Sequence, residues 1–94
     1  MALEFEWDAA KAASNQRKHG ITFREASTVF GDPMGRLGAD PRHSDLEERL
    51  VLVGTSRRGR LLAVMFTERA LAIRLISARR ATSHERTDYE ESQH

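Results

Sequence analysis

The chain has 94 residues and no cysteine, so it offers one modest core and neither a disulfide framework nor a thiolate metal site. Its 15 basic and 14 acidic residues nearly balance, and no apolar run approaches the roughly 20 residues that cross a membrane. Residues 1–8 lack the apolar segment of a secretory signal. We therefore expect a single domain, residues 1–94, in the cytoplasm.

The N-terminal quarter predicts a strand followed by a helix. Residues Glu4–Trp7 alternate between acidic and aromatic side chains, which favours a short edge strand. Asp8 is a typical N-cap for the alanine-rich run that follows, and Gly20 a typical residue just past its end. One side of this helix carries polar residues at helical spacing: Lys11, Asn15, Lys18 and His19. This stripe is either a solvated side or a functional one.

A second helix and a connection follow. Thr22 with Glu25 three residues later predicts a capping box, and the apolar residues after Phe23 have helical spacing. Gly31-Asp32-Pro33 ends this helix. A short strand is expected near Met34–Leu37.

The second half predicts an antiparallel meander and a last helix. The strand candidates are Arg49–Ser56, Arg60–Glu68 and Ala72–Ala78. A capping box at Thr82 and Glu85 opens a polar helix whose only large apolar residue is Tyr89. The fold class is therefore α+β: two N-terminal helices packed on a three- or four-stranded antiparallel sheet, with a short C-terminal helix.

Both faces of this sheet are predicted to be apolar. In the simplest registers one face carries Leu50, Leu52, Leu62, Val64, Phe66 and Ile76. The other carries Val51, Val53, Ala63, Met65, Ile73 and Leu75. Two helices cover only one face, so the C-terminal helix, a second copy or a partner protein must cover the other. We expect an apolar surface that recruits a partner.

Positive charge is concentrated in the last two strands. Residues 57–80 contain seven arginines and one acid. Arginine suits phosphate because its planar guanidinium donates several hydrogen bonds. Arg74, between two apolar neighbours, has three possible roles: it extends to solvent at the sheet rim, it pairs with Glu47 or Glu48, or it clamps a phosphate.

The sequence contains no pattern for metal or nucleotide chemistry. None of the four histidines forms an H-x-x-x-H pair, and there is no P-loop. We expect no cofactor. The chain does contain the side-chain types that metal-independent RNA cleavage uses for proton transfer and for stabilising phosphate charge: many arginines, Lys18, His19, Glu47, Glu48 and Tyr89. This composition permits the chemistry without identifying it.

Several blocks resemble the BrnT family of type II toxins. These are FEWDAAKAASNQRKHGITFREASTVFGDP (5–33), HSDLEERLVLVG (43–54), RGRLLAVMFTER (58–69) and IRLISARRATSHERTDYE (73–90). They follow one another in the family's order and cover nearly the whole chain. The W-D-x-x-K-x-x-x-N-x-x-K-H-G block from Trp7 and the R-x-I-S-A-R block from Arg74 are the most specific, with Leu75 where isoleucine is common.

The resemblance implies a small RelE-like domain. It implies a ribonuclease toxin that blocks translation and is neutralised by a BrnA-like, ribbon-helix-helix-like antitoxin. It also implies a toxin–antitoxin heterotetramer that meets operator DNA only through the antitoxin. The alternative is a non-catalytic module that binds nucleic acid or protein, such as a toxin homologue that has lost activity.

The resemblance also selects site residues. It implies a catalytic set of His19, Glu47, Arg49, Arg74 and Arg79. It implies a substrate-binding set of Lys18, Arg60 and Tyr89. The arginines would bind phosphate, and Glu47 and His19 would transfer protons. Two alternatives stay open: Glu47 forms an ion pair with Arg49 or Arg74, and His19 only caps its helix.

Overall fold

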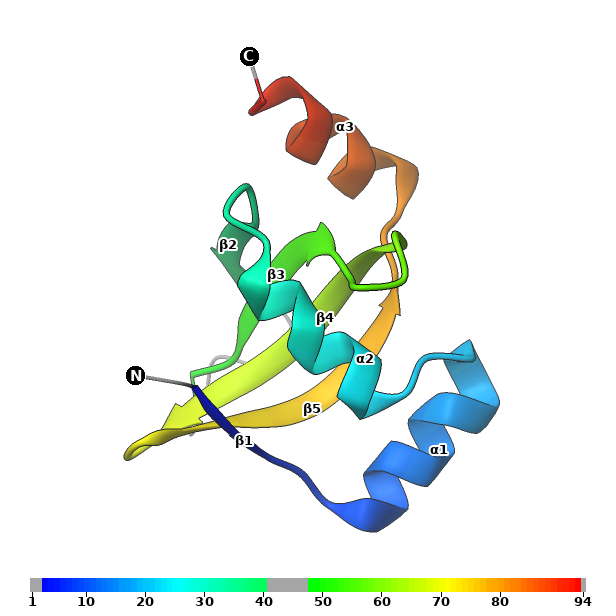
Figure 1. The fold of residues 1–94 in the computed structure, drawn as a ribbon, viewed down its shortest axis with the longest axis vertical. Helices are drawn as coiled ribbons and strands as arrows, with labels where there is room; N and C mark the ends of the chain where they lie inside the picture. Colours follow the sequence, from blue (N-terminus) through cyan, green and yellow to red (C-terminus); the bar gives the residue numbers. More distant parts are fainter. Residues whose placement is uncertain (1–2, 41–47, 94) are drawn as a thin grey trace.

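A five-stranded sheet with two N-terminal helices on one side and a C-terminal helix at one end makes up the fold (Figure 1). The computed structural model describes residues 3–40 and 48–93. Its elements in chain order are β1 (Glu4–Glu6), α1 (Ala9–His19), α2 (Phe23–Thr28), η1 (Val29–Gly31), β2 (Arg36–Ala39), β3 (Leu50–Thr55), β4 (Leu61–Arg69), β5 (Ala72–Arg80) and α3 (Ser83–Glu91). No helix in these ranges is long and apolar enough to cross a membrane.

The sheet is mixed, with the strand order β1-β5-β4-β3-β2. The prediction of a three- or four-stranded antiparallel sheet is wrong on this point, because β1 adds a strand that runs parallel to β5. The edge strand at the N-terminus is confirmed, and the short strand expected near Met34 begins at Arg36. Phe5 explains why β1 docks beside β5. Its ring packs edge-to-face on the ring of Phe30, with 5.1 Å between the ring centroids, and contacts the core.

Local signals set the helix ends. The Asp8 carboxylate accepts a hydrogen bond from Lys11 N at 3.0 Å, and Gly20 takes a left-handed conformation with φ of 70°. Thr82 and Glu85 form the complete capping box that the sequence predicts. At the start of α2 only half of the predicted box forms, because the Glu25 side chain turns away from the helix end toward the sheet.

The main core lies between α1, α2 and the sheet. Its fully buried large side chains are Phe23, Ile21, Leu62, Leu75, Val29 and Val64. The register of β3 against β4, with Leu50 opposite Phe66, is the one expected from the sequence. The faces of these two strands are therefore as predicted.

A β-bulge changes the face of β5. Met65 pairs with Ser77 and Phe66 pairs with Leu75, so Ile76 is an extra residue in β5. Leu75 and Ile73 consequently pack with Phe66 in the core beneath the helices. The prediction that Ile76 lies on that face, and Ile73 and Leu75 on the other, is wrong, because one inserted residue inverts the alternation.

The sheet face opposite α1 and α2 is called the distal face here. A second apolar cluster of Val53, Leu61 and Ala63 lies on it, with Tyr89 of α3 packed against this cluster. The face predicted to need a cover is thus partly covered by α3. This cover is thin, because none of the α3 residues is buried.

Candidate functional site

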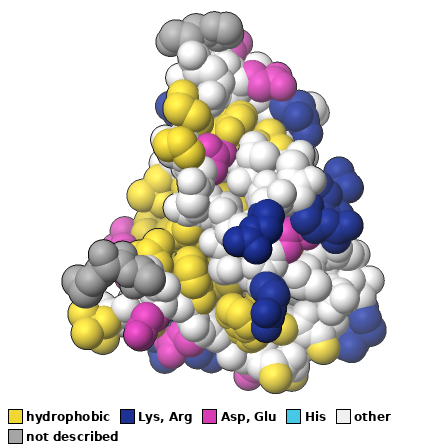
Figure 2. Space-filling view, in the orientation of Figure 1, with side chains coloured by type: hydrophobic (Ala, Val, Ile, Leu, Met, Phe, Trp, Pro, Cys, Tyr) yellow, Lys and Arg dark blue, Asp and Glu magenta, His cyan; other side chains and the backbone are white. Residues whose placement is uncertain are grey.

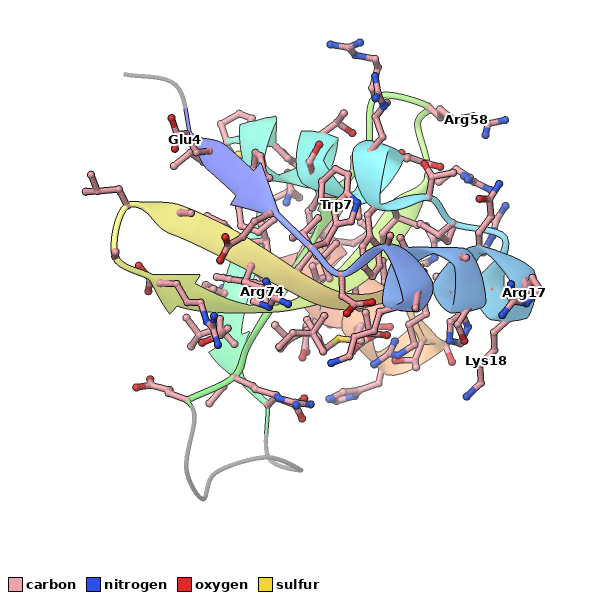
Figure 3. All side chains as sticks on the ribbon, turned by 90° about the horizontal axis from the view of Figure 1, so that it is seen from below. Glu4, Trp7, Arg17, Lys18, Arg58 and Arg74 are labelled. Atoms are coloured by element: carbon pink, nitrogen blue, oxygen red, sulfur yellow. The ribbon has the colours of Figure 1, made fainter. Side chains whose placement is uncertain are left out.

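A small groove separates α1 from the edge of β5. It has a volume of about 190 Å³ and is lined by Lys11, Ser14, Asn15, Lys18, His19, Ile76 and Ser77. We call these residues the cationic groove. Lys11, Ser14 and Lys18 recur along one side of α1 because residues three and four apart share a helix face. In Figure 3 Lys18 projects to the side of the sheet away from Trp7.

Asn15 fixes α1 against β5. Its amide nitrogen donates to the carbonyl oxygens of Ala78 at 2.9 Å and Ile21 at 3.0 Å, and its amide oxygen accepts from Ala78 N at 3.0 Å. The side chain thus replaces a neighbouring strand at the free edge of β5. It is only 7% exposed, so these bonds leave no buried polar group of the amide unsatisfied. The groove is therefore held rigidly beside the bulge at Ile76.

Arg74 lies farther along β5, on the distal face. It is opposite Thr67 of β4 and Glu6 of β1. The nearest atoms of Arg74 and Glu6 are 3.8 Å apart, and the side chains are 31% and 43% exposed. A pair this long and this exposed contributes little stability. The guanidinium of Arg74 remains accessible to a phosphate.

Arg79 and Arg60 have closer partners than Arg74. Arg79 donates to both oxygens of Glu85, at 2.8 and 3.1 Å, which ties β5 to the first turn of α3. Arg60 donates through two nitrogens to the carboxylate of Glu25, whose side chain is 5% exposed. Ser56 donates to the same carboxylate at 2.7 Å. Bonding to Arg60 is the main reason that the pKa of Glu25 is lowered despite its burial.

Tyr89 is held by the end of β3 and the loop before β2. Its hydroxyl donates to Asp32 at 2.7 Å and lies 3.2 Å from Thr55 Oγ1. The bond to Asp32 raises the pKa of Tyr89, because ionisation would place two negative charges together. Burial raises the pKa of Asp32, but hydrogen bonds from Thr55 N, Tyr89 and Met34 N outweigh it and leave this pKa below its usual value. Tyr89 therefore anchors α3.

Arg49 and Glu47 precede β3. Arg49 is partly buried and its carbonyl oxygen accepts from Asp40 N at 2.9 Å. Glu47 lies outside the described residues, so neither its predicted role nor its predicted ion pairs can be placed. The sequence analysis considered Glu47 and Glu48 as partners of Arg74. The ion-pair partner that the structure gives Arg74 is Glu6.

The structure brings two predicted residues, Lys18 and His19, into one groove. It places Arg74 and Arg79 on the same face of β5, while Arg60 lies on the other side of the sheet with Glu25. Lys11 and Ser77 are groove residues that the prediction left out. The signal for Lys11 was present in the helical spacing of Lys11 and Lys18, but the bulge that brings in Ser77 has no sequence signal.

Among the described residues no three His, Asp or Glu side chains cluster closely enough to hold a metal ion.

Comparisons with known proteins give one family and one fold. A family model described as "Ribonuclease toxin, BrnT, of type II toxin-antitoxin system" matches residues 7–85. The crystal structure of the Brucella abortus ribonuclease toxin, BrnT, has a similar fold, with a TM-score of 0.63 and 24% sequence identity. That similarity covers 86% of this chain and 99% of the Brucella chain. No curated protein matches the chain.

Proposed function

The chain belongs to the BrnT family of ribonuclease toxins of type II toxin–antitoxin systems. We propose that it cleaves RNA without a metal ion, at the edge of β5 beside the cationic groove. We further propose that cleavage blocks translation in the cytoplasm and that a BrnA-like antitoxin neutralises it. The cationic groove is the observation that carries this proposal.

The groove offers charge and a proton-transfer group in one place. Lys11 and Lys18 present two ammonium groups, and His19 adds an imidazole within the same 190 Å³. Arg74 adds a guanidinium on the adjoining face of β5. An RNA backbone laid along this edge would meet phosphate-binding cations on both α1 and β5. Ser77 supplies a hydroxyl at the floor of the groove.

The reaction is an attack of the ribose 2′-oxygen on the neighbouring phosphorus. The 2′-hydroxyl loses its proton to a base, the bond between phosphorus and the 5′-oxygen breaks, and an acid protonates that oxygen. His19 and Glu47 are the proposed proton-transfer pair. Arg49, Arg74 and Lys18 stabilise the negative charge that accumulates on the phosphate oxygens.

The remaining predicted residues act by position. Arg79 orients the end of β5 through Glu85, Arg60 ties the β3–β4 turn to α2, and Tyr89 holds α3 on the distal face. None of these three side chains lines the cationic groove, and each binds RNA only where its carboxylate partner leaves a donor free.

The antitoxin completes the proposed assembly. Two toxin chains and two ribbon-helix-helix-like antitoxin chains form a heterotetramer, and operator DNA is bound only by the antitoxin. The near balance of charge in this chain, with 15 basic and 14 acidic residues, agrees with a protein that does not itself coat DNA.

Cleavage of total RNA in EDTA tests the reaction. The wild type should cut RNA in the chelator, and Arg74→Ala and Lys18→Ala should each lower the rate by about 10²-fold, because each removes charge stabilisation at the reacting phosphate. Arg17→Ala is the matched control, since Arg17 has the same charge as Lys18 and lies next to it on α1 but does not line the groove. Circular dichroism establishes that each variant is folded.

Two results would contradict the proposal. Cleavage that stops in EDTA and returns with a divalent ion would remove the metal-independent mechanism. A folded wild type that neither cuts RNA nor slows growth would favour the non-catalytic binding module.

A further inference from the structure

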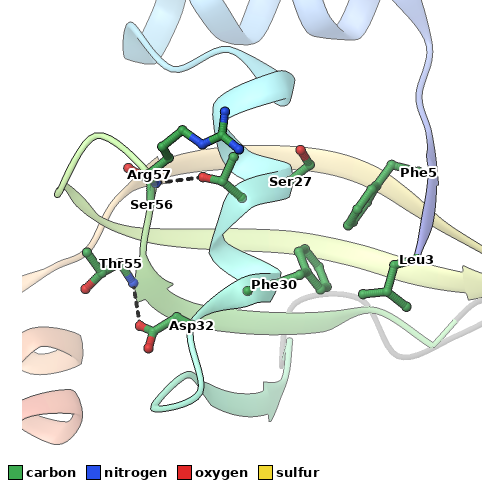
Figure 4. A pocket seen from close by; sticks show the side chains of 10 residues that line it. Leu3, Phe5, Ser27, Phe30, Asp32, Thr55, Ser56 and Arg57 are labelled. Atoms are coloured by element: carbon green, nitrogen blue, oxygen red, sulfur yellow. Dashed lines mark hydrogen bonds between the residues drawn. The ribbon is translucent and has the colours of Figure 1, made fainter. Parts of the chain in front are cut away.

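A second, larger groove opens on the helix side of the sheet. It has a volume of about 630 Å³ and lies between β1, the α2–η1 segment and the end of β3 (Figure 4). Leu3, Phe5 and Phe30 form its apolar end, and Asp32, Ser56 and Arg57 form its polar end. None of the predicted site residues lines it. We call it the helix-side groove.

An apolar surface over β2 and β3 lies on the same side of the sheet as this groove. Figure 2 shows hydrophobic side chains gathered along the β2–β3 side of this face. Leu37 of β2 is opposite Leu52 of β3, so both side chains are on the helix side of the sheet. Leu3 and Leu37 are 56% and 64% exposed. The helices thus cover β4 and β5 but leave an apolar surface beside them.

Arg57 lines the same groove, and Arg24 lies one turn of α2 before its lining residue Ser27. Arg24 and Arg57 are exposed, and within the described residues neither forms an ion pair; Arg58 is 70% exposed and lies 3.9 Å from Glu25. Figure 2 shows Lys and Arg side chains gathered on this face, across from the apolar surface. An occupant that matches this face needs apolar side chains at one end and carboxylates at the other.

We propose that the helix-side groove is where the antitoxin docks, through a segment whose apolar side chains cover Leu3, Phe30 and Leu37 and whose adjoining Asp or Glu residues face Arg24 and Arg57. This inference rests on the proposed function, which supplies an antitoxin. The apolar floor disfavours RNA, whose phosphates need cations throughout. Because the helix-side groove and the cationic groove share no lining residue, the antitoxin contacts the toxin away from the cationic groove.

Dissociation kinetics test this surface. A BrnA-like antitoxin is immobilised, and its complex with the purified full-length chain is followed by biolayer interferometry. Leu37→Asp should raise the dissociation rate at least tenfold because it places a charge in an apolar contact. Arg57→Glu should raise it severalfold through like-charge repulsion. The matched controls are Leu71→Asp, at a 92% exposed leucine in the β4–β5 turn, and Arg17→Glu, and both should leave the rate unchanged. Thermal melting establishes that all four variants are folded.

The outcomes separate the possible occupants. Unchanged dissociation for both groove variants, or an equal effect of Leu71→Asp, overturns the proposal. A wild type that is a dimer alone and becomes a monomer on Leu37→Asp assigns the groove to a second copy and also overturns it. The proposal is also overturned if the Leu37→Asp variant loses RNA cleavage but still binds the antitoxin. If neither the wild type nor any variant cuts RNA, the proposed cleavage reaction is contradicted. Faster dissociation of the Leu37→Asp and Arg57→Glu variants would still support the docking surface.

Discussion

Two groups of charged residues lie on opposite sides of the same sheet, and they differ in burial. On the helix side, Glu25 is 5% exposed and receives hydrogen bonds from Arg60 and Ser56. On the distal face, Arg74 and Glu6 are 3.8 Å apart and both substantially exposed. The same residue types therefore have different functions: a buried, fully bonded pair stabilises one conformation, whereas an exposed and loosely paired arginine can exchange its partner for a phosphate.

Removing one carboxylate from each group should give the largest contrast. Glu25→Ala removes the mostly buried carboxylate to which Arg60 and Ser56 donate, and we expect a loss of about 3 kcal/mol in the free energy of unfolding. Glu6→Ala should change it by less than about 0.5 kcal/mol, because exposed pairs are nearly neutral. Urea denaturation measures both. Equal losses for the two variants would mean that burial does not separate these groups.

Acid should also weaken the bonded carboxylates, with a smaller loss of folding stability than Glu25→Ala causes. Glu25 has a pKa below its usual value of 4.5 when folded, chiefly through Arg60, and Glu85 has a lowered pKa chiefly through Arg79. A carboxyl whose pKa is lowered on folding adds stability above its unfolded pKa and loses it as the pH falls through the folded pKa. The wild type should thus lose stability below about pH 4.5.

A variant identifies which carboxyl causes the loss. Glu25→Gln starts from a lower stability at pH 7 but should decline less steeply between about pH 5 and 3, because its share of proton uptake is gone. Urea unfolding at a series of pH values gives both slopes. Parallel slopes would assign the acid sensitivity to the other carboxyls whose pKa is lowered, Asp8, Asp32 and Glu85.

The burial contrast between the groups was only partly predictable from sequence. Asp8, Gly20 and Thr82 mark helix ends by local chemistry, and the structure has those ends where they were expected. The register of β3 against β4 followed from alternation. Glu25 was assigned to a capping box, because sequence spacing reveals a partner three residues away and cannot reveal Arg60, which lies 35 residues further along the chain.

The candidate site was less predictable than the fold for a related reason. Lys18 and His19 are neighbours on one helix, so their proximity was visible. Ser77 reaches the groove only because Ile76 is an extra residue in β5, and a bulge depends on how two strands pair. The docking of β1 beside β5 likewise depends on the packing of Phe5 against Phe30, which are 25 positions apart in the chain.

Arg79 offers the finest test of the comparison, because it combines the two cases. It is on the distal face like Arg74, yet it is bonded to Glu85 through two nitrogens, and the side chains are 29% and 21% exposed. We expect a double-mutant cycle of Arg79→Ala and Glu85→Ala to give a coupling of about 1 kcal/mol in urea unfolding. The same cycle on Arg74 and Glu6 should give a coupling near zero. A coupling near zero for Arg79 as well would class it with Arg74 as an arginine available to substrate, and Arg79→Ala should then slow RNA cleavage without loss of stability. A coupling of the expected size means that Arg79 holds β5 to α3, so that its contribution to cleavage is made through position.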